Sequence, residues 1–226
     1  MTSSNVTLYG HLTYDTIFDG NKSYETIGSI GNVWKAFINF SNNINVRIEP
    51  TEIGEALIYV DKEKVRRAST ATLSVKTRTP FIQISDWSHI LYLNQLNDLS
   101  FVKEVSLTSK KISADICAGK PLKNLQVLKY VDLLFISDED LWMPIDELRK
   151  YVKGDIIVHY TSGSTYYGQD TFSTKVKDIL KGVNIIGAGD TFAAATITNL
   201  ISKKPVKEAV AIAHSMTYNL IKKNNE

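Results

Sequence analysis

The feature of this sequence that most constrains its fold is an alternation of short apolar stretches with stretches of helical period. Apolar runs of strand length recur along the chain, and several precede segments whose apolar residues return every three or four positions. This alternation is typical of an α/β domain with a mainly parallel sheet. The predicted strands are Val6–Tyr9, Ala56–Val60, His89–Leu93, Ile112–Ile116, Val131–Ile136 and Asp155–Tyr160.

Two helices are the clearest in the pattern. In the first, Val33, Phe37 and Phe40 recur at helical spacing. The second begins after Pro205, a residue suited to a helix start. Its predicted apolar face comprises Val206, Ala209, Val210, Ala213, Met216 and Leu220.

The alternation is interrupted between about Asn42 and Phe81, where β-prone runs follow one another without a helix. These runs, Glu55–Val60 and Ala71–Lys76, predict a small antiparallel sheet beside the main one. We therefore expect one domain over residues 1–226, with about 42–83 forming either a lid over a site or an edge for a partner subunit.

Composition narrows the class of protein. With 226 residues and 43% hydrophobic content the chain can bury a substantial core. The first residues lack a signal-peptide pattern, and no stretch reaches the roughly 18 apolar residues of a membrane span. A cytoplasmic protein that does not bind a membrane is the expectation. Its single cysteine, Cys117, excludes an intrachain disulfide, and its scattered charges, net +2, argue against nucleic-acid binding.

The strongest chemical signal is Gly187-Ala188-Gly189-Asp190, which precedes an apolar helix. Small residues leave backbone amides bare at a helix N-terminus, where the helix dipole also favours an anion. A carboxylate beside a phosphate site suggests a general base that takes the proton of an attacking hydroxyl. An Asp that only caps the helix is the alternative.

Other phosphate and metal motifs are absent. The sequence has no G-x-x-x-x-G-K-[ST] and no complete G-x-G-x-x-G, which argues against a P-loop ATPase or a dinucleotide-binding dehydrogenase. The four histidines, His11, His89, His159 and His214, lack the spacing of a metal site and are interpreted as structural or surface residues.

Several segments of the sequence, taken together, resemble those of one protein family. Gly187–Phe192 resembles the C-terminal signature of the pfkB, or ribokinase-like, carbohydrate kinases, and other segments follow in that family's order. Gly10–Asp15 is similar to the end of its first strand, and Gly28–Asn32 to the turn that lines its sugar pocket. Further similar segments are Pro50-Thr51, Ala56–Asp61, Ile112–Asp115, Val131–Asp140 and Ile156–Gly163.

The resemblance implies a ribokinase-like three-layer sandwich with a mainly parallel central sheet and a small β lid. It also implies ATP and Mg²⁺ as cofactors, with Asp190 as base and the amides of Gly187, Ala188 and Gly189 as phosphoryl cradle. Asp15, Gly28 and Asn32 would bind the acceptor at the carboxyl edge of the sheet. The candidates on the nucleotide side are Gly163, Asn184 and His214, and Asp140 could hold the metal through water.

Several departures from the family pattern are visible. Ile27 and Glu52 stand where the family has glycine, and the chain is shorter than most members. Only Phe18–Tyr24 remains of the lid that follows Asp15. Because a kinase must exclude water, a reduced lid predicts either a large acceptor or a homodimer formed through the Asn42–Phe81 region.

The leading hypothesis is an ATP-dependent kinase that phosphorylates a hydroxyl of a sugar, polyol, sugar derivative or nucleoside. The alternative is a catalytically weak or inactive ribokinase-like protein that binds a ligand to regulate a partner. A vitamin or pyrimidine-precursor kinase on the same scaffold is the third hypothesis, although Asp15 and Asn32 suit a polyol better.

Overall fold

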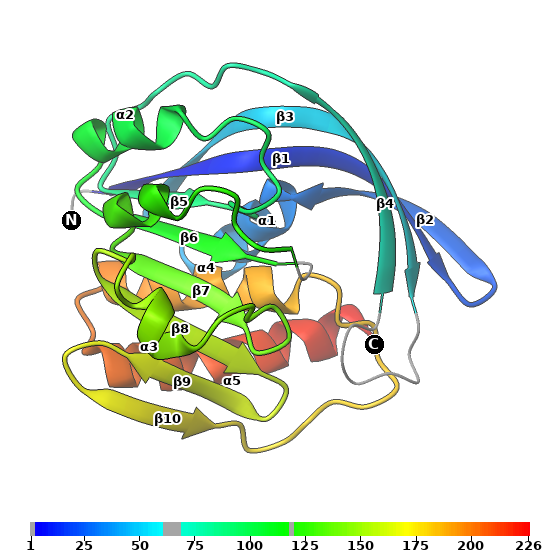
Figure 1. Ribbon diagram of the computed structural model, residues 1–226. Helices are drawn as coiled ribbons and strands as arrows, with labels where there is room; N and C mark the ends of the chain where they lie inside the picture. The colour runs from blue at the N-terminus through cyan, green and yellow to red at the C-terminus, as the bar shows by residue number, and fades with distance from the viewer. Residues whose placement is uncertain (1–2, 61–68, 118–119) are drawn as a thin grey trace.

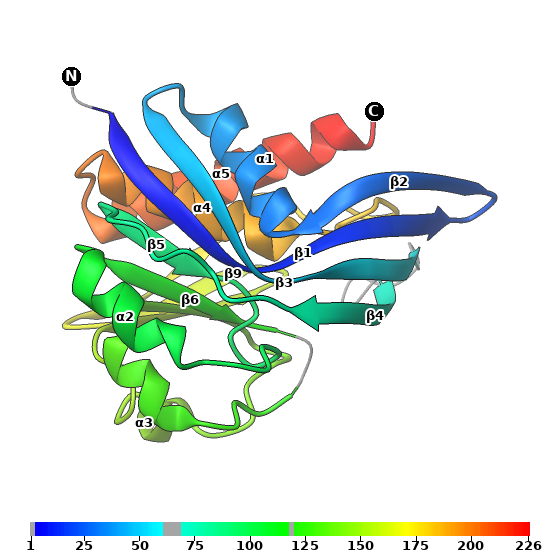
Figure 2. The same ribbon diagram turned by 90° about the horizontal axis from the view of Figure 1, so that it is seen from above.

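A mixed sheet lies between two layers of helices in the computed structural model, which describes residues 3–60, 69–117 and 120–226 (Figure 1, Figure 2). The strands are β1 (Ser4–Asp19), β2 (Lys22–Ser29), β3 (Ile44–Val60), β4 (Ser69–Thr77), β5 (Trp87–Ile90), β6 (Ile112–Ile116), β7 (Leu133–Ser137), β8 (Asp155–Tyr160), β9 (Gly163–Tyr167) and β10 (Thr171–Lys175). The helices are α1 (Ile30–Phe40), α2 (Phe101–Thr108), the 3-10 helix η1 (Leu125–Tyr130), α3 (Ile145–Leu148), α4 (Ala188–Ile201) and α5 (Val206–Asn224).

The described strands form one ten-stranded sheet with the order β10-β9-β8-β7-β6-β5-β1-β3-β4, and β2 pairs with β1 outside this row. Strands β3, β1, β5, β6, β7 and β8 run parallel, so their carboxyl ends meet at one edge. Antiparallel pairs lie at the two sides, β8-β9-β10 on one and β3-β4 on the other. The expected α/β sandwich with a mainly parallel sheet is confirmed.

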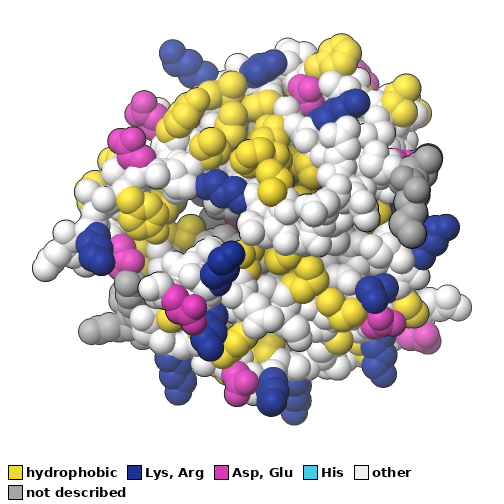
Figure 3. Space-filling model, turned by 180° about the vertical axis from the view of Figure 1, so that it is seen from behind, with side chains coloured by type: hydrophobic (Ala, Val, Ile, Leu, Met, Phe, Trp, Pro, Cys, Tyr) yellow, Lys and Arg dark blue, Asp and Glu magenta, His cyan; other side chains and the backbone are white. Residues whose placement is uncertain are grey.

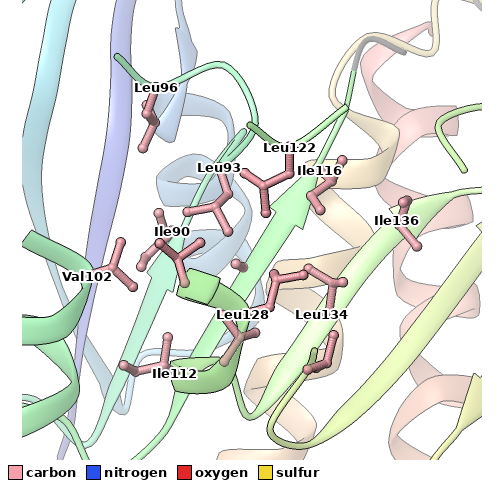
Figure 4. Packing of buried hydrophobic residues seen from close by; sticks show 14 of the residues in the cluster. Ile90, Leu93, Leu96, Val102, Ile112, Ile116, Leu122, Leu128, Leu134 and Ile136 are labelled. Carbon is pink, nitrogen blue, oxygen red and sulfur yellow. The ribbon is translucent and has the colours of Figure 1, made fainter. Parts of the chain in front are cut away.

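Helices α1, α4 and α5 cover one face of the sheet, and α2, η1 and α3 cover the other (Figure 2). Strand β7 shows why both faces are needed: Leu133 and Phe135 belong to the core under α4, while Leu134 and Ile136 belong to the opposite core. A strand apolar on both faces is stable only when both are covered. Figure 4 shows the second core, where side chains of β5, β6 and β7 interlock beneath η1.

Helix α4 is buried on all sides, in keeping with its small, apolar residues. Ala193, Ala194 and Ala195 let it pack closely against the sheet, and α1 and α5 lie on either side of it. Because α4 is fixed along its length, the residues at its N-terminus are held in place. This is the helix that begins with the glycine-rich motif.

The lid is larger than the sequence predicts. Strand β1 continues ten residues past the predicted end at Tyr9, pairs with β2 from Leu12 to Asp19, and stays parallel to β3 as far as Val60. The β3–β4 pair therefore belongs to the main sheet and is not a separate sheet beside it, and the lid is not reduced to Phe18–Tyr24. Residues 61–68 of the expected lid segment lie outside the described residues.

The reason for this difference is the polarity of the inward positions. Beyond Gly10, the buried residues of β1 include His11, Thr13 and Asp15, so the apolar alternation that marks a strand is lost where the strand begins to line a polar cavity. The short strands β9 and β10 were not predicted because their residues are mostly polar and show no run of apolar positions.

Basic and acidic side chains are interspersed on the face seen in Figure 3, and apolar side chains gather between them in its upper part. None of the helices in the described ranges combines the length and the apolar character that crossing a membrane requires.

Candidate active site

Two adjoining cavities open at the carboxyl edge of the parallel strands. The larger, of about 780 Å³, extends between Asp15 and Asp190 and is called here the acceptor cavity. The smaller, of about 310 Å³, lies beside α5 and is called the donor cavity. Both are lined by Glu139, His159, Ile185, Ala188 and Gly189. The N-terminus of α4 therefore stands between them.

The glycine-rich motif forms the N-terminus of α4 as expected. Gly187 is the N-cap with φ of 75°, a left-handed conformation that favours glycine. The amide of Ala188 donates to the Ile185 carbonyl at 3.0 Å, so it is not part of a free cradle. Within the described residues the amides of Gly187, Gly189 and Asp190 have no acceptor, and they remain available to an anion.

The Asp190 carboxylate is buried and lines the acceptor cavity rather than the packed core. Its Oδ2 accepts a hydrogen bond from Asn32 Nδ2 at 3.2 Å, and the Tyr92 hydroxyl lies 3.1 Å from both carboxylate oxygens. Asn32, expected to bind the acceptor, thus also holds the candidate base. A carboxylate oriented by two donors beside an open cavity is placed to accept a proton from a bound hydroxyl.

Burial is the main cause that raises the pKa of Asp190, to about 6. The hydrogen bonds from Asn32 and Tyr92 act in the opposite direction, and the charge of Asp15 adds to the rise. A pKa near 6 leaves the carboxylate ionised at neutral pH while making it a better proton acceptor than an ordinary Asp.

Asp15 faces the same cavity from β1. It is 3% exposed, and its Oδ1 has no hydrogen-bond partner among the described residues. Burial raises its pKa, opposed by a hydrogen bond from Thr13 and by the charge of Lys35. A buried carboxylate oxygen without a donor is costly unless a ligand supplies one, and a polyol hydroxyl would do so.

The side chain of Asp15 is the reason why position 28 holds a glycine. A Cβ atom at this position would stand 1.8 Å from Asp15 Oδ2, so only glycine leaves room for the carboxylate. The expected acceptor-side residues Asp15, Gly28 and Asn32 therefore lie together around one end of the cavity, although Gly28 acts by giving space rather than by lining the cavity itself.

Four acidic residues besides Asp15, and one basic residue, Lys120, line the acceptor cavity. Asp115 from β6, and Glu139 and Asp140 after β7, line it together with Asp190. In the part of the chain that is described, no three His, Cys, Asp or Glu side chains are close enough to hold a metal ion by themselves. This donor set fits Mg²⁺, which needs few carboxylates and keeps much of its water and phosphate coordination.

Glu52, which stands where the family has glycine, pairs with a buried histidine. His11 Nε2 lies 2.8 Å from Glu52 Oε2, both side chains are 1% exposed, and Glu52 Oε1 accepts the amide of Asn97 at 2.8 Å. Burial lowers the pKa of His11, and the neighbouring Glu52 opposes this. His11, interpreted from sequence as a structural or surface residue, is buried and belongs to the wall of the acceptor cavity.

The donor cavity is mainly apolar. His214 stacks on Phe192 with ring centroids 4.6 Å apart, and its Nε2 lies 2.8 Å from Ser164 Oγ. Val176, Ile179, Tyr218 and Ile221 complete much of the wall. Burial lowers the pKa of His214 and of His159 to about 4, so both rings are neutral at physiological pH. Such a cavity suits a flat, uncharged ring better than a small anion.

Two of the three expected nucleotide-side residues lie elsewhere. Gly163 begins β9 and is not among the residues that line either cavity; a Cβ there would stand 2.0 Å from the Thr174 carbonyl oxygen, so the glycine serves strand pairing. Asn184 also lies outside both linings: it accepts from the Ile186 amide and donates to the Tyr24 hydroxyl. Only His214 lines the donor cavity.

Sequence reasoning missed Tyr92, Asp115 and His159 as site residues. Tyr92 follows the end of β5 by two residues at a position without a motif, whereas Asp115 in β6 and His159 in β8 fall within the family-like segments Ile112–Asp115 and Ile156–Gly163 but were not assigned to the site. Their one shared signal is their place at or near the carboxyl ends of parallel strands, where α/β folds bind ligands.

Comparison with known proteins agrees with this geometry. Residues 108–219 match the model described as pfkB family carbohydrate kinase. A search of curated protein sequences found no match.

Solved structures with the same fold cover nearly the whole chain. They include an adenosine kinase from Sinorhizobium meliloti (TM-score 0.74, 11% identity, 97% of this chain and 94% of that chain) and an Arabidopsis thaliana ribokinase complexed with ribose and ATP (0.69, 14%, 97% and 93%). A pyrophosphate-dependent kinase in the ribokinase family, in a sulfate complex, is similar as well (0.70, 16%, 96% and 95%). At these identities the likeness shows the fold.

Proposed function

Since this chain belongs to the pfkB family of carbohydrate kinases and has the ribokinase-like fold, we propose that it moves the γ-phosphoryl group of ATP to a hydroxyl of a sugar, sugar derivative or nucleoside. The observation that carries the proposal is the single cavity that joins Asp190 to Asp15 across the free amides of α4. Base, acceptor ligand and anion site are thereby within reach of one small molecule.

The chemistry follows from the placement of each group. Asp15 accepts hydrogen bonds from acceptor hydroxyls, and Asp190 takes the proton of the hydroxyl that attacks. The amides of Gly189 and Asp190, at the positive end of the helix dipole, stabilise negative charge on the transferred phosphoryl group. The lid strands cover the acceptor and limit the access of water.

A divalent cation would neutralise phosphate charge in this reaction. Asp140 and Glu139, on the side of the acceptor cavity that adjoins the donor cavity, are the residues that would hold it, through water where they do not touch it.

The donor is proposed to be a nucleoside triphosphate because of the donor cavity. An adenine ring would find an apolar space between His214, Ile179 and Tyr218, whereas pyrophosphate has no ring to fill it. Some kinases with this fold are pyrophosphate-dependent, so both donors belong in the assay.

The test is a coupled assay with ATP or pyrophosphate, Mg²⁺ and a panel of pentoses, hexoses, inositols and nucleosides. We expect acceptor-dependent release of ADP, and a loss of about 100-fold or more in D190N, because general base catalysis contributes that much. D170N, an Asp-to-Asn change at an exposed position outside both cavities, is the matched control. Binding of sugar or nucleotide without turnover would instead support a regulatory protein, and turnover with pyrophosphate alone would contradict the ATP assignment.

A homodimer through the lid is part of the proposal. On the outward face of β1 and β3, Tyr14 is 63%, Tyr59 52% and Leu57 44% exposed, and the neighbouring β4 is an edge strand. A second copy of the chain covering this face would bury these side chains and stiffen the lid. Sedimentation at micromolar concentration should give twice the chain mass, and the double variant Y14K/Y59K should give one; a monomeric mass for the unmodified chain contradicts it.

A further inference from the structure

The backbone of Tyr92, two residues after the end of β5, has an unusual conformation. Its φ is 52°, a left-handed value that costs energy in a residue with a side chain. Its amide donates to Asp115 Oδ1, the next amide, of Leu93, donates to the Asp115 carbonyl at 2.9 Å, and its carbonyl accepts the Gln95 amide at 2.8 Å. Three hydrogen bonds therefore fix this backbone, which is why the predicted strand His89–Leu93 ends at Ile90.

The conformation places the phenol against the candidate base. The Tyr92 hydroxyl lies 3.1 Å from Oδ1 and 3.1 Å from Oδ2 of Asp190, and the ring meets His11 edge-on with centroids 6.4 Å apart. Asn32 supplies a second donor, at 3.2 Å from Oδ2. The hydroxyl is therefore equidistant from the two carboxylate oxygens, and together with Asn32 it fixes how the carboxylate is turned.

We infer that Tyr92 is a positioning residue for Asp190: its hydroxyl fixes the orientation of the carboxylate beside the acceptor cavity. This inference rests on the proposed kinase function and adds a residue to it. Strain stored at a functional site is the expected sign of such a role, because the surrounding bonds must outweigh its cost.

The charged neighbours of Asp190 determine what loss of the phenol would do. The other titratable side chains that line the same cavity are His11 and Asp15 from β1, Asp115 from β6, Cys117 and Lys120 after β6, Glu139 and Asp140 after β7, and His159 from β8. Burial and the charge of Asp15 favour the protonated form of Asp190, whereas the hydrogen bonds from Asn32 and Tyr92 favour the charged form. Removing the Tyr92 hydroxyl leaves one of these two bonds, so the pKa of Asp190 should rise.

The experiment measures the titration of Asp190 in the full chain. Carboxyl-carbon NMR of ¹³C-labelled aspartate gives the titration, with D190N to assign the signal, in the unmodified chain and in Y92F. Y166F is the matched control, because Tyr166 also donates to a carboxylate, Asp155 at 2.7 Å, but lies outside both cavities. We expect Y92F to raise the Asp190 midpoint by about one pH unit, since a hydrogen bond to a charged group has that effect, and Y166F to leave it unchanged.

A second substitution keeps the test valid if Y92F does not fold. Placing 3-fluorotyrosine at position 92 makes the phenol a stronger donor without changing its shape, so the Asp190 midpoint should fall. In the kinase assay the acidic limb of kcat should move in the same direction as the titration in each variant.

The two proposals fail separately. Absence of acceptor-dependent turnover in the unmodified chain overturns the kinase proposal, while the NMR titration still decides the role of Tyr92. If the Asp190 midpoint in Y92F and in the fluorinated chain equals that of the unmodified chain, the inference is wrong. A lower melting temperature in Y92F and Y166F alike, without a shift of the Asp190 midpoint, would give Tyr92 a structural role only and equally overturns it.

Discussion

The acceptor cavity and the donor cavity share a wall but differ in the groups that line them. The acceptor cavity has five carboxyl groups among aliphatic residues such as Ile58 and Ile116, and one of its buried oxygens, Asp15 Oδ1, has no partner among the described residues. The donor cavity is lined mainly by aliphatic and aromatic side chains, its two histidines are neutral, and its acidic and basic residues are Asp138, Glu139, Asp178 and Lys181. Under the proposed function the first cavity orients hydroxyl groups and moves a proton, and the second holds a ring by contact area.

The comparison predicts different sensitivity to small steric changes. In G28A the new methyl group would stand 1.8 Å from Asp15 Oδ2, so the carboxylate must move. Because a displacement of about 1 Å at a reacting group can cost about 100-fold, we expect a loss of that order in kcat/KM for the acceptor, with little change in KM for ATP. Steady-state kinetics with each substrate varied in turn measure both constants.

G20A is the control for this prediction. Gly20 has a φ of 61°, so alanine there carries backbone strain, but its Cβ meets nothing within 4 Å and the position lies at the tip of the β1–β2 hairpin. Equal losses in G20A and G28A would mean that lid strain, and not the position of Asp15, controls acceptor binding.

The donor cavity should respond through contact area alone. H214A removes a ring that lines the donor cavity, and losing about 1 kcal/mol of contact with the bound adenine corresponds to a rise of roughly fivefold in KM for ATP. Acceptor KM and kcat at saturating ATP should stay as they are. K207A, an exposed change on the same helix, is the control, and an equal loss for the acceptor in H214A would contradict the separation of the two cavities.

The pH dependence of kcat should come from Asp190, which lines the acceptor cavity. Asp190 acts as a base when deprotonated, and its pKa of about 6 lies above the value of about 4 for His159 and His214. As the pH falls through 6, kcat at saturating ATP should fall, and below that by about tenfold per unit. A pH series at saturating ATP measures this, and a kcat that stays flat between pH 7 and 5 would contradict the assignment.

Prediction from sequence succeeded where side chains repeat a pattern. Strands β6 and β8 have the predicted bounds because each contains a run of buried residues that are mostly apolar, and α5 begins at Val206, directly after the predicted Pro205. The glycine-rich turn before α4 was recognisable since few residues other than glycine tolerate its backbone. Prediction failed along the second half of β1, where the inward residues His11, Thr13 and Asp15 are polar and line the cavity.

The sequence by itself determined the class of fold and the helix that carries Asp190, because local patterns of polarity and glycine encode strands, helices and turns; the resemblance to a family added Asp15 and Asn32, which line the same cavity as Asp190. Only the tertiary structure decided that Tyr92 contacts Asp190, that Glu52 pairs with His11, and that Gly163 and Asn184 lie outside the cavities. Those relations join residues far apart in the chain, and they depend on strand order and register, which no local pattern specifies.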